Sequence, residues 1–194
     1  MSTPTLILIT GYARSGKDTL AEGIMSGISP KTGWALKLNF ADALKQSCND
    51  YIKTLNLDED GIDFFDEQFK VKHRSFLVAA GSFARSINRD VFASRFVSKC
   101  LGFAGSHGPG VVVCSDWRYM NELRVAQDWL IRAGWNVVTV EIQTSGVGPA
   151  NEEEGLSIGE IRREHSPSLS LMFAPDRAQL IKAEGRNLAR QIGL

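Results

Sequence analysis

Two glycines and a lysine near the start of the chain have the spacing of a phosphate-binding loop. The segment reads Gly11-Tyr-Ala-Arg-Ser-Gly-Lys-Asp-Thr19, which contains the pattern Gly-x-x-x-x-Gly-Lys between an apolar run and an amphipathic stretch. The glycines permit backbone angles that turn successive N–H groups toward one anion, and the lysine adds a point charge. The pattern predicts binding of the triphosphate of ATP or a similar nucleotide. The expected contacts are Gly11, Arg14, Ser15, Gly16, Lys17, Asp18 and Thr19.

The residue after the lysine departs from the common form of this loop. Asp18 stands where a Ser or Thr hydroxyl usually binds Mg²⁺, and Thr19 follows it. A carboxylate oxygen is also a hard ligand, so we expect Asp18 to bind Mg²⁺ directly or through water. Thr19 is then free to hydrogen-bond the α-phosphate. The alternative is a chance glycine-rich turn in which Asp18 only adds negative charge to the first turn of a helix.

A second acidic residue ends the most apolar run of the chain, Val111-Val-Val-Cys-Ser-Asp116. The carboxyl ends of strands in an open parallel sheet face the ligand crevice. Asp116 is therefore predicted to hold Mg²⁺ through water or to position the phosphate acceptor. The alternative is that Asp116 only caps the next helix.

Several arginines could stabilise a phosphoryl group during transfer, when negative charge spreads over its oxygens. Arg85 and Arg89 are four residues apart and share a helical face, whereas Arg162 and Arg163 follow a glycine-rich segment that could close as a lid. For any single arginine, a solvent-exposed surface charge is the alternative. The residues expected to act in catalysis are Lys17, Arg14, Asp116, Arg162 and Arg163.

Apolar runs alternate with amphipathic segments along the chain, which predicts an α/β fold with a mainly parallel, five-stranded sheet. The predicted strands are 5–10, 35–40, 111–115, 135–142 and 179–182. The predicted helices begin near residue 16, cover 42–55 and much of 58–103, and then cover 120–133, 160–173 and 186–192. The glycine-rich, acidic segment 144–159 is expected to be a mobile loop.

Composition argues against several classes of protein. Lys+Arg and Asp+Glu both total 22, so the chain lacks the excess of cations expected for stable nucleic-acid binding or a basic membrane-binding surface. No run approaches the roughly 18 apolar residues of a membrane span. The N-terminus lacks the basic start and cleavage site of a signal peptide, and the three cysteines have no C-x-x-C spacing. These features predict a cytoplasmic location.

Four sequence blocks together resemble the deoxynucleoside monophosphate kinases of bacteriophages, which have the P-loop nucleoside monophosphate kinase fold. The blocks are the loop 11–19, Asn39-Phe-Ala-Asp-Ala-Leu-Lys45, Gly81-Ser82 with Arg85, Asp90 and Phe92, and Ser115-Asp-Trp-Arg-Tyr-Met-Asn-Glu122. The resemblance implies one three-layer P-loop kinase domain over 1–194, with a core of 5–56 and 108–194. It also implies a helical acceptor-binding insert at about 57–107 and a lid at about 144–165.

The resemblance further implies ATP- and Mg²⁺-dependent phosphorylation of a (deoxy)nucleoside 5′-monophosphate to the diphosphate, in the host cytoplasm if the chain comes from a bacteriophage. Arg162 and Arg163 would belong to the lid, and Asp18 and Asp116 would face the metal ion. A homodimer is compatible with the sequence. The residues expected on the acceptor side are Asp42, Lys45, Arg74, Arg85, Arg89, Asp116 and Arg118.

Two other functions fit the same phosphate-binding loop. The Gly-Lys-Asp sequence also occurs in animal phosphomevalonate kinases, so the acceptor could be a small phosphorylated metabolite or a modified base in DNA. A nucleotide-binding regulatory module that hydrolyses slowly or not at all is a third hypothesis. It would need a segment that rearranges on hydrolysis, and the sequence indicates none.

Overall fold

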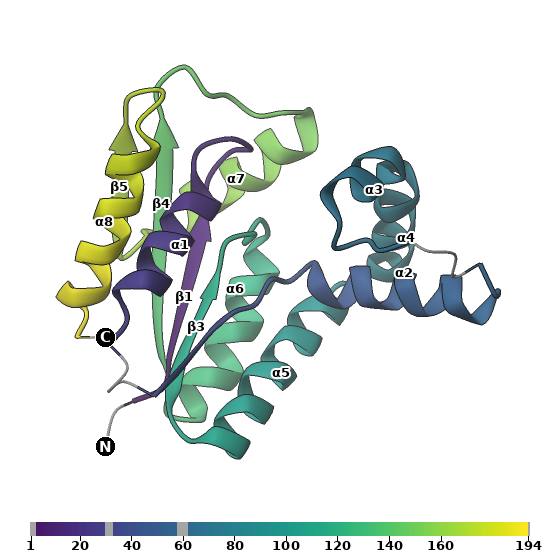
Figure 1. Ribbon diagram of the computed structural model, residues 1–194, viewed down its shortest axis with the longest axis horizontal. Helices are drawn as coiled ribbons and strands as arrows, with labels where there is room; N and C mark the ends of the chain where they lie inside the picture. Colours follow the sequence, from purple (N-terminus) through teal and green to yellow (C-terminus); the bar gives the residue numbers. More distant parts are fainter. Residues whose placement is uncertain (1–2, 30–32, 58–61, 194) are drawn as a thin grey trace.

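A five-stranded parallel sheet forms the centre of the molecule (Figure 1). The computed structural model of the protein describes residues 3–29, 33–57 and 62–193. The strand order is β2-β3-β1-β4-β5, and every neighbouring pair is parallel. The strands are β1 (Thr5–Thr10), β2 (Trp34–Lys37), β3 (Gly110–Cys114), β4 (Asn136–Thr144) and β5 (Leu169–Phe173). The prediction of a mainly parallel five-stranded α/β sheet is confirmed.

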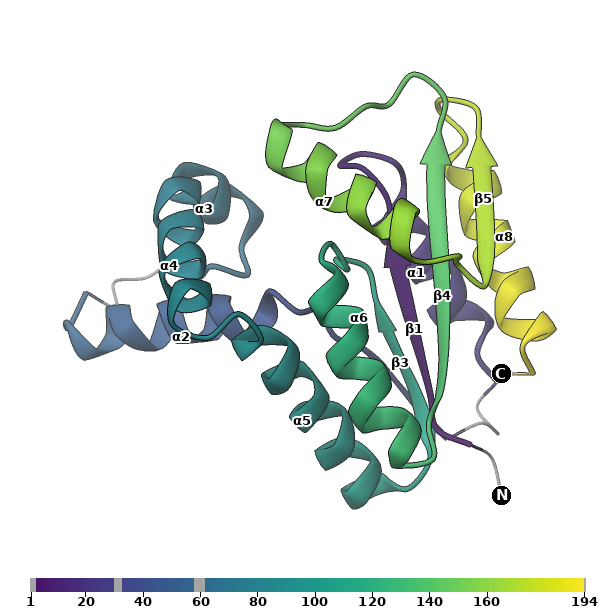
Figure 2. The same cartoon turned by 180° about the vertical axis from the view of Figure 1, so that it is seen from behind.

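Helices cover both faces of the sheet, which makes three layers (Figures 1 and 2). One face packs against α1 (Lys17–Gly27) and α8 (Ala178–Gln191). The other face packs against α5 (Val91–His107), α6 (Met120–Ala126) with the π-helical turn η2 (Gln127–Ile131), and α7 (Glu152–Glu164).

The central strand β1 explains why its sequence shows no polar alternation. Leu6 and Leu8 belong to the core cluster on one face of the sheet, and Ile7 and Ile9 belong to the cluster on the other. All four side chains have no solvent exposure. A strand covered on both faces has no position at which a polar side chain would reach water.

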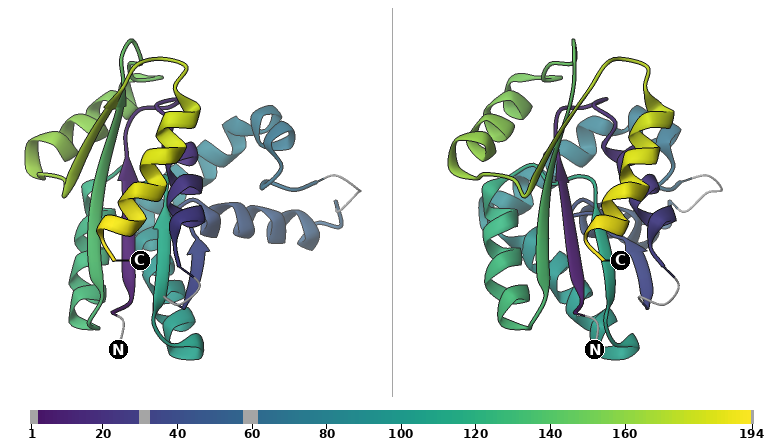
Figure 3. Two further views of the ribbon diagram at one scale, coloured as in Figure 1. Left: turned by 60° about the vertical axis from the view of Figure 1, so that its left-hand side comes forward. Right: turned by 90° about the vertical axis from the view of Figure 1, so that its left-hand side faces the viewer.

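Three helices protrude from the sheet as an arm (Figures 1 and 3). They are α2 (Asp42–Thr54), α3 (Glu67–Lys72) and α4 (Arg74–Ile87), with a small core of their own around Cys48, Phe64 and Leu77. Helix α5 follows the arm but returns to the sheet, where Phe96, Val97 and Cys100 are buried. The arm overlaps the segment proposed as an acceptor-binding insert, and that role remains a prediction.

The fifth strand lies earlier in the sequence than predicted. Residues 169–173 form β5 beside β4, where a helix over 160–173 was predicted, and the predicted strand 179–182 lies inside α8. Helix α8 buries Ile181, Gly185 and Leu188, which share one helical face. The short apolar pair at 180–181 is therefore part of a helical stripe, which a window of four residues cannot distinguish from a strand.

The segment predicted to be a mobile loop over 144–159 contains the start of a helix that buries one face. Helix α7 begins at Glu152, with the side chain of Asn151 accepting a hydrogen bond from the backbone N–H of Glu154. Ile158 and Ile161 bury their side chains in the core cluster that also contains Leu6 and Leu8. The three consecutive glutamates made the segment look like a solvent-exposed loop, although acidic residues are favourable in the first turn of a helix.

None of the helices in the described ranges 3–29, 33–57 and 62–193 is long and apolar enough to cross a membrane.

Candidate functional site

The loop between β1 and α1 has the backbone geometry of an anion-binding turn. Gly11 and Gly16 adopt φ values of +146° and +93°, and Arg14 also has a positive φ of +64°. A Cβ at position 11 would lie 2.2 Å from the carbonyl oxygen of Ile142, so a side chain does not fit there. The side-chain oxygen of Ser15 is buried and is one of two such atoms in the described residues without a hydrogen-bond partner. A buried polar atom without a partner is costly, and a bound phosphate would satisfy it.

The ammonium group of Lys17 lies inside this turn. Its Nζ donates to the carbonyl oxygens of Gly11 at 2.7 Å and Tyr12 at 2.6 Å. The side chain is buried, and burial, with the nearby positive charge of Arg118, lowers the pKa of Lys17 to about 8. Lysine and arginine are therefore close enough to repel each other, and an anion between them would relieve that repulsion.

Asp18 faces the end of β3 at the mouth of the loop. Its Oδ1 accepts a hydrogen bond from Ser115 Oγ at 2.7 Å and forms an ion pair with Lys37 Nζ at 2.8 Å. Burial acts to raise the pKa of Asp18, but the hydrogen bonds from Lys37 and Ser115 outweigh it and lower the pKa below its usual value. Asp18 therefore presents a carboxylate oxygen next to the hydroxyl of Ser115.

The Asp18 carboxylate and the Ser115 hydroxyl are two oxygen ligands that fit a magnesium ion whose other ligands come from phosphate and water. Mg²⁺ is commonly held by one or two carboxylates together with substrate phosphates rather than by a cage of protein ligands. The described residues contain no group of three or more His, Cys, Asp or Glu side chains arranged to hold a metal ion. Asp18 and Ser115 would contact the ion, and its chemical contribution would be to neutralise phosphate charge.

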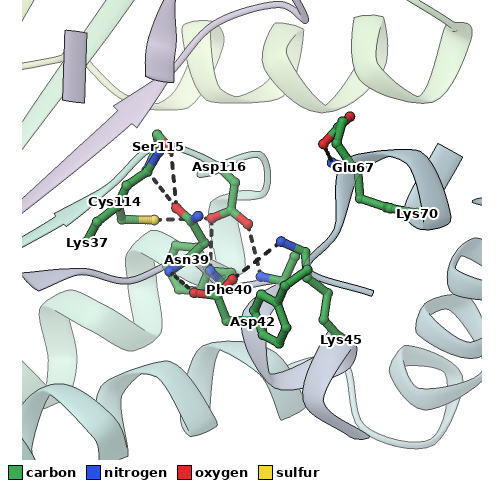
Figure 4. A network of polar contacts seen from close by, with 12 residues as sticks. Lys37, Asn39, Phe40, Asp42, Lys45, Glu67, Lys70, Cys114, Ser115 and Asp116 are labelled. Carbon is green, nitrogen blue, oxygen red and sulfur yellow. Dashed lines mark hydrogen bonds and ion pairs between the residues drawn. The ribbon is translucent and has the colours of Figure 1, made fainter. Parts of the chain in front are cut away.

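The carboxylate of Asp116 is directed at the start of α2 (Figure 4). Its two oxygens accept the backbone N–H groups of Phe40 and Ala41, each at 2.9 Å, and Cys114 Sγ donates to Oδ1 at 3.2 Å. Burial raises the pKa of Asp116 more than these hydrogen bonds lower it. Both oxygens therefore have protein partners, and a role for Asp116 at the metal ion remains a prediction.

A second set of polar contacts holds the segment between β2 and α2. Asn39 Oδ1 accepts the backbone N–H of Ser115 at 3.0 Å, and Asp42 Oδ2 accepts the backbone N–H of Asn39 at 2.8 Å. Asp42 is the first residue of α2 rather than its N-cap, and Lys45 lies 3.5 Å from its other oxygen. The predicted acceptor residues Asp42 and Lys45 are thereby placed at the base of the arm (Figure 4).

Helix α7 contacts the phosphate-binding loop through charged side chains. Glu154 Oε1 accepts the backbone N–H of Ala13 at 3.0 Å, and Arg118 Nη2 lies 3.9 Å from the same oxygen. Arg162 lies 4.8 Å from the ring centroid of Tyr12, where a cation–π contact forms. Arg162 also donates to Glu141 at 2.6 Å and to the Tyr12 hydroxyl at 3.1 Å.

Arg85 lies between two aromatic rings near the base of the arm. Its guanidinium carbon is 5.6 Å from the ring centroid of Phe92 and 5.4 Å from that of Tyr119. The Tyr119 hydroxyl donates to Glu153 at 2.5 Å, and burial together with this contact raises the pKa of Tyr119 to about 12. The rings hold the arginine without neutralising its charge, which leaves the guanidinium able to bind an anion.

Three of the predicted arginines lie outside this network. Arg74 at the start of α4, Arg89 after α4, and Arg163 near the end of α7 are exposed. The remaining predicted side chains line the loop or its flank. Arg14, Ser15, Gly16 and Thr19 border a pocket of about 180 Å³, whose other side is lined by residues at the start of α8 and in the turn before it: Ala174, Asp176, Arg177 and Ala178.

The fold is shared with solved kinase structures. The Mycobacterium tuberculosis APS kinase CysC, in a mutant form, is 16% identical with a TM-score of 0.51. The same enzyme in complex with AMPPNP and APS is 15% identical with a TM-score of 0.50, and both alignments cover 100% of each chain. This protein has a P-loop kinase fold. At these identities the likeness concerns the fold alone. No protein-family model and no curated protein matches the sequence.

Within this P-loop kinase fold, four residues of the site were not predicted from the sequence: Lys37, Asn39, Ser115 and Glu154. Ser115 was placed only at the end of a predicted strand. Lys37 stands on an edge strand, Glu154 is one of three consecutive glutamates, and Asn39 has no distinctive spacing. Each reaches the site only because the parallel strands and α7 meet at one edge of the sheet. Asn39 and Ser115 each begin a sequence block that resembles the phage kinases, and that resemblance was the signal that could have indicated them.

Proposed function

We propose that the protein is an ATP- and Mg²⁺-dependent phosphotransferase that converts a (deoxy)nucleoside 5′-monophosphate to its diphosphate. The loop 11–19 would bind the triphosphate, with Lys17 near the transferred group. The pocket between Thr19 and Arg177 would receive the base of the donor nucleotide.

One observation carries the proposal: hydrogen bonds connect the phosphate-binding loop to the base of the arm. Ser115 links Asp18 to Asn39, because its hydroxyl donates to Asp18 and its backbone N–H donates to Asn39 Oδ1. The adjacent Asp116 accepts the N–H groups of Phe40 and Ala41, and Figure 4 shows Asp116 beside Phe40. The donor loop and the start of α2 are therefore positioned relative to each other by the same end of β3. A kinase needs this rigidity because donor and acceptor must be aligned within a fraction of an ångström.

The charges around this edge suit in-line phosphoryl transfer. Lys17 and Arg118 would stabilise negative charge on the transferred group, while Arg85 would hold the acceptor phosphate. No side chain has to form a covalent intermediate, because an acceptor phosphate oxygen attacks the γ-phosphorus directly, the bond from that phosphorus to the β,γ-bridging oxygen breaks, and ADP leaves. The proton balance is simple, since that oxygen is already ionised at neutral pH.

An acceptor screen tests the proposal. Purified protein is incubated with γ-labelled ATP, Mg²⁺ and each common nucleoside or deoxynucleoside monophosphate, and transfer of label is measured by thin-layer chromatography. We expect a labelled diphosphate with at least one acceptor and none without Mg²⁺. Failure with every monophosphate, despite measurable ATP binding, would refute the acceptor assignment.

Phosphorylation of another acceptor is the second candidate, because the structurally similar CysC enzyme was solved with both AMPPNP and APS. The same screen therefore includes APS, small phosphorylated metabolites and DNA containing modified bases. Label on one of these, and on no monophosphate, would favour this candidate.

A further inference from the structure

Glu154 is a buried carboxylate at the mouth of the phosphate-binding loop. Only 3% of its side chain is exposed. Oε1 accepts the N–H of Ala13 and Oε2 accepts the N–H of Ala150 at 2.8 Å. Isolated buried carboxylates are strongly disfavoured, so these partners must compensate for the lost hydration.

The groups that compensate for the lost hydration of the Glu154 carboxylate are of the kinds that bind phosphate. They include a backbone N–H of the loop, the Arg118 guanidinium at 3.9 Å, and the positive charge of Lys17, whose pKa Glu154 acts to raise. Two backbone N–H groups and two cations around an anion are the elements of a phosphate site. Glu154 therefore uses donors that a polyphosphate would also use.

The position of Glu154 is set by the fold rather than by a freely moving loop. Ile158 and Ile161, one and two turns further along α7, are buried in the core. Arg162 also attaches the helix to Tyr12 and Glu141. The carboxylate thus stands on the first turn of a helix that is anchored one and two turns further along, while that first turn and the preceding segment 145–151 have no such apolar anchors of their own.

We propose that Glu154 is a positioning residue that acts as a resident anion. In the nucleotide-free protein it orders Ala13 and Arg118 as a phosphate would. An incoming polyphosphate takes over these partners and displaces the carboxylate from them, so Glu154 lowers the affinity for nucleotides in proportion to their negative charge. This inference rests on the proposed function, because it assumes that the loop binds a nucleoside polyphosphate.

The test compares Glu154→Gln with Glu153→Gln. Each removes one negative charge from the same helical turn, but Glu153 contacts the Tyr119 hydroxyl rather than the loop. Dissociation constants of Mg²⁺-AMPPNP and ADP are measured by calorimetry, and melting temperatures show whether each variant is folded. We expect Glu154→Gln to bind AMPPNP about ten-fold more tightly, which corresponds to about 1.4 kcal/mol, and ADP with a smaller gain. Glu153→Gln should stay within about two-fold of the wild type.

Unchanged or weaker AMPPNP binding by a folded Glu154→Gln variant would show that Glu154 only supports the loop, and would overturn the inference. Hydrogen exchange on the wild type is a second test that needs no variant. AMPPNP should speed exchange of the amides in 150–154, because Ala150 loses its carboxylate acceptor, and slower or unchanged exchange there would contradict the proposal. Wild-type protein that binds no AMPPNP would instead refute the proposed function.

Discussion

Replacing Asp116 by asparagine should destabilise the protein, because this carboxylate holds the start of α2. Its two oxygens each accept a backbone N–H at 2.9 Å. An asparagine side chain offers one oxygen and places an NH₂ group against the second N–H. One buried donor then has no acceptor, which costs about 1–3 kcal/mol.

Removing the buried charge also returns part of its desolvation cost, which offsets some of this penalty. We therefore expect Asp116→Asn to lower the free energy of unfolding by about 2 kcal/mol. For a chain of this size, each kcal/mol lowers the melting temperature by about 2–4 °C, so the midpoint should fall by about 4–8 °C. The assay is thermal unfolding followed by circular dichroism, with urea unfolding as an independent measure of the free energy.

Asp18→Asn is the matched control, since it changes the same functional group at the other proposed metal position. Asp18 has a side-chain exposure of 74%, and its ion pair with Lys37 is partly solvated, so less than about 1 kcal/mol should be lost. Asp18→Asn should instead raise the Mg²⁺ concentration needed for half-maximal transfer. If Asp116→Asn melts like the wild type while its Mg²⁺ requirement rises, Asp116 acts at the metal ion and does not hold the segment before α2, which would refute the expected loss of stability.

Three further substitutions test separate parts of the site. Lys17→Ala should lower the rate of phosphoryl transfer by at least about 100-fold and preserve the far-UV spectrum, because it removes a charge at the transferred group; near-normal turnover would exclude this role. Arg85→Ala should raise KM for the acceptor and not for ATP, and the opposite pattern would move Arg85 to the donor side. Glu122 is buried in the first turn of α6, and its Oε2 accepts the backbone N–H groups of Arg118 and Tyr119. Burial, with the nearby negative charge of Asp116, raises the pKa of Glu122 to about 8 from 4.5. The folded protein therefore keeps a proton that the unfolded chain releases, and this component of stability falls as pH rises from about 4.5 to 8. In urea unfolding at several pH values, Glu122→Gln should remove that decline, and an unchanged slope would contradict the assignment.

The parts of the fold that could be predicted are those in which one local pattern allows one structure. The unalternating runs at 5–10 and 111–115 suit strands covered on both faces, and the glycines of the loop suit a turn with positive φ. The C-terminal third was less predictable. Short apolar runs at 169–173 and 179–182 fit either a strand or a helix, and pairing of β5 with β4 decided between them.

The candidate site divides in the same way. The sequence indicated the loop 11–19 and Asp116, but it did not indicate the partner of either. Ala13 and Glu154 are 141 residues apart, and Asp116 is 75 residues from Ala41. Sequence spacing carries no information about such contacts.

The sequence by itself determined that the chain has a glycine-rich turn with a lysine between a buried strand and a helix, and it predicted phosphate binding there, because backbone freedom at the glycines and the charge of Lys17 are local properties. Only the tertiary structure decided which charges surround that loop. Parallel strands end at a common edge, so Ser115 meets Asp18 and Asp116 meets the start of α2, while the packing of Ile158 and Ile161 brings Glu154 to Ala13. Burial at this edge weakens screening by water, and the same side chains would interact little if they were exposed.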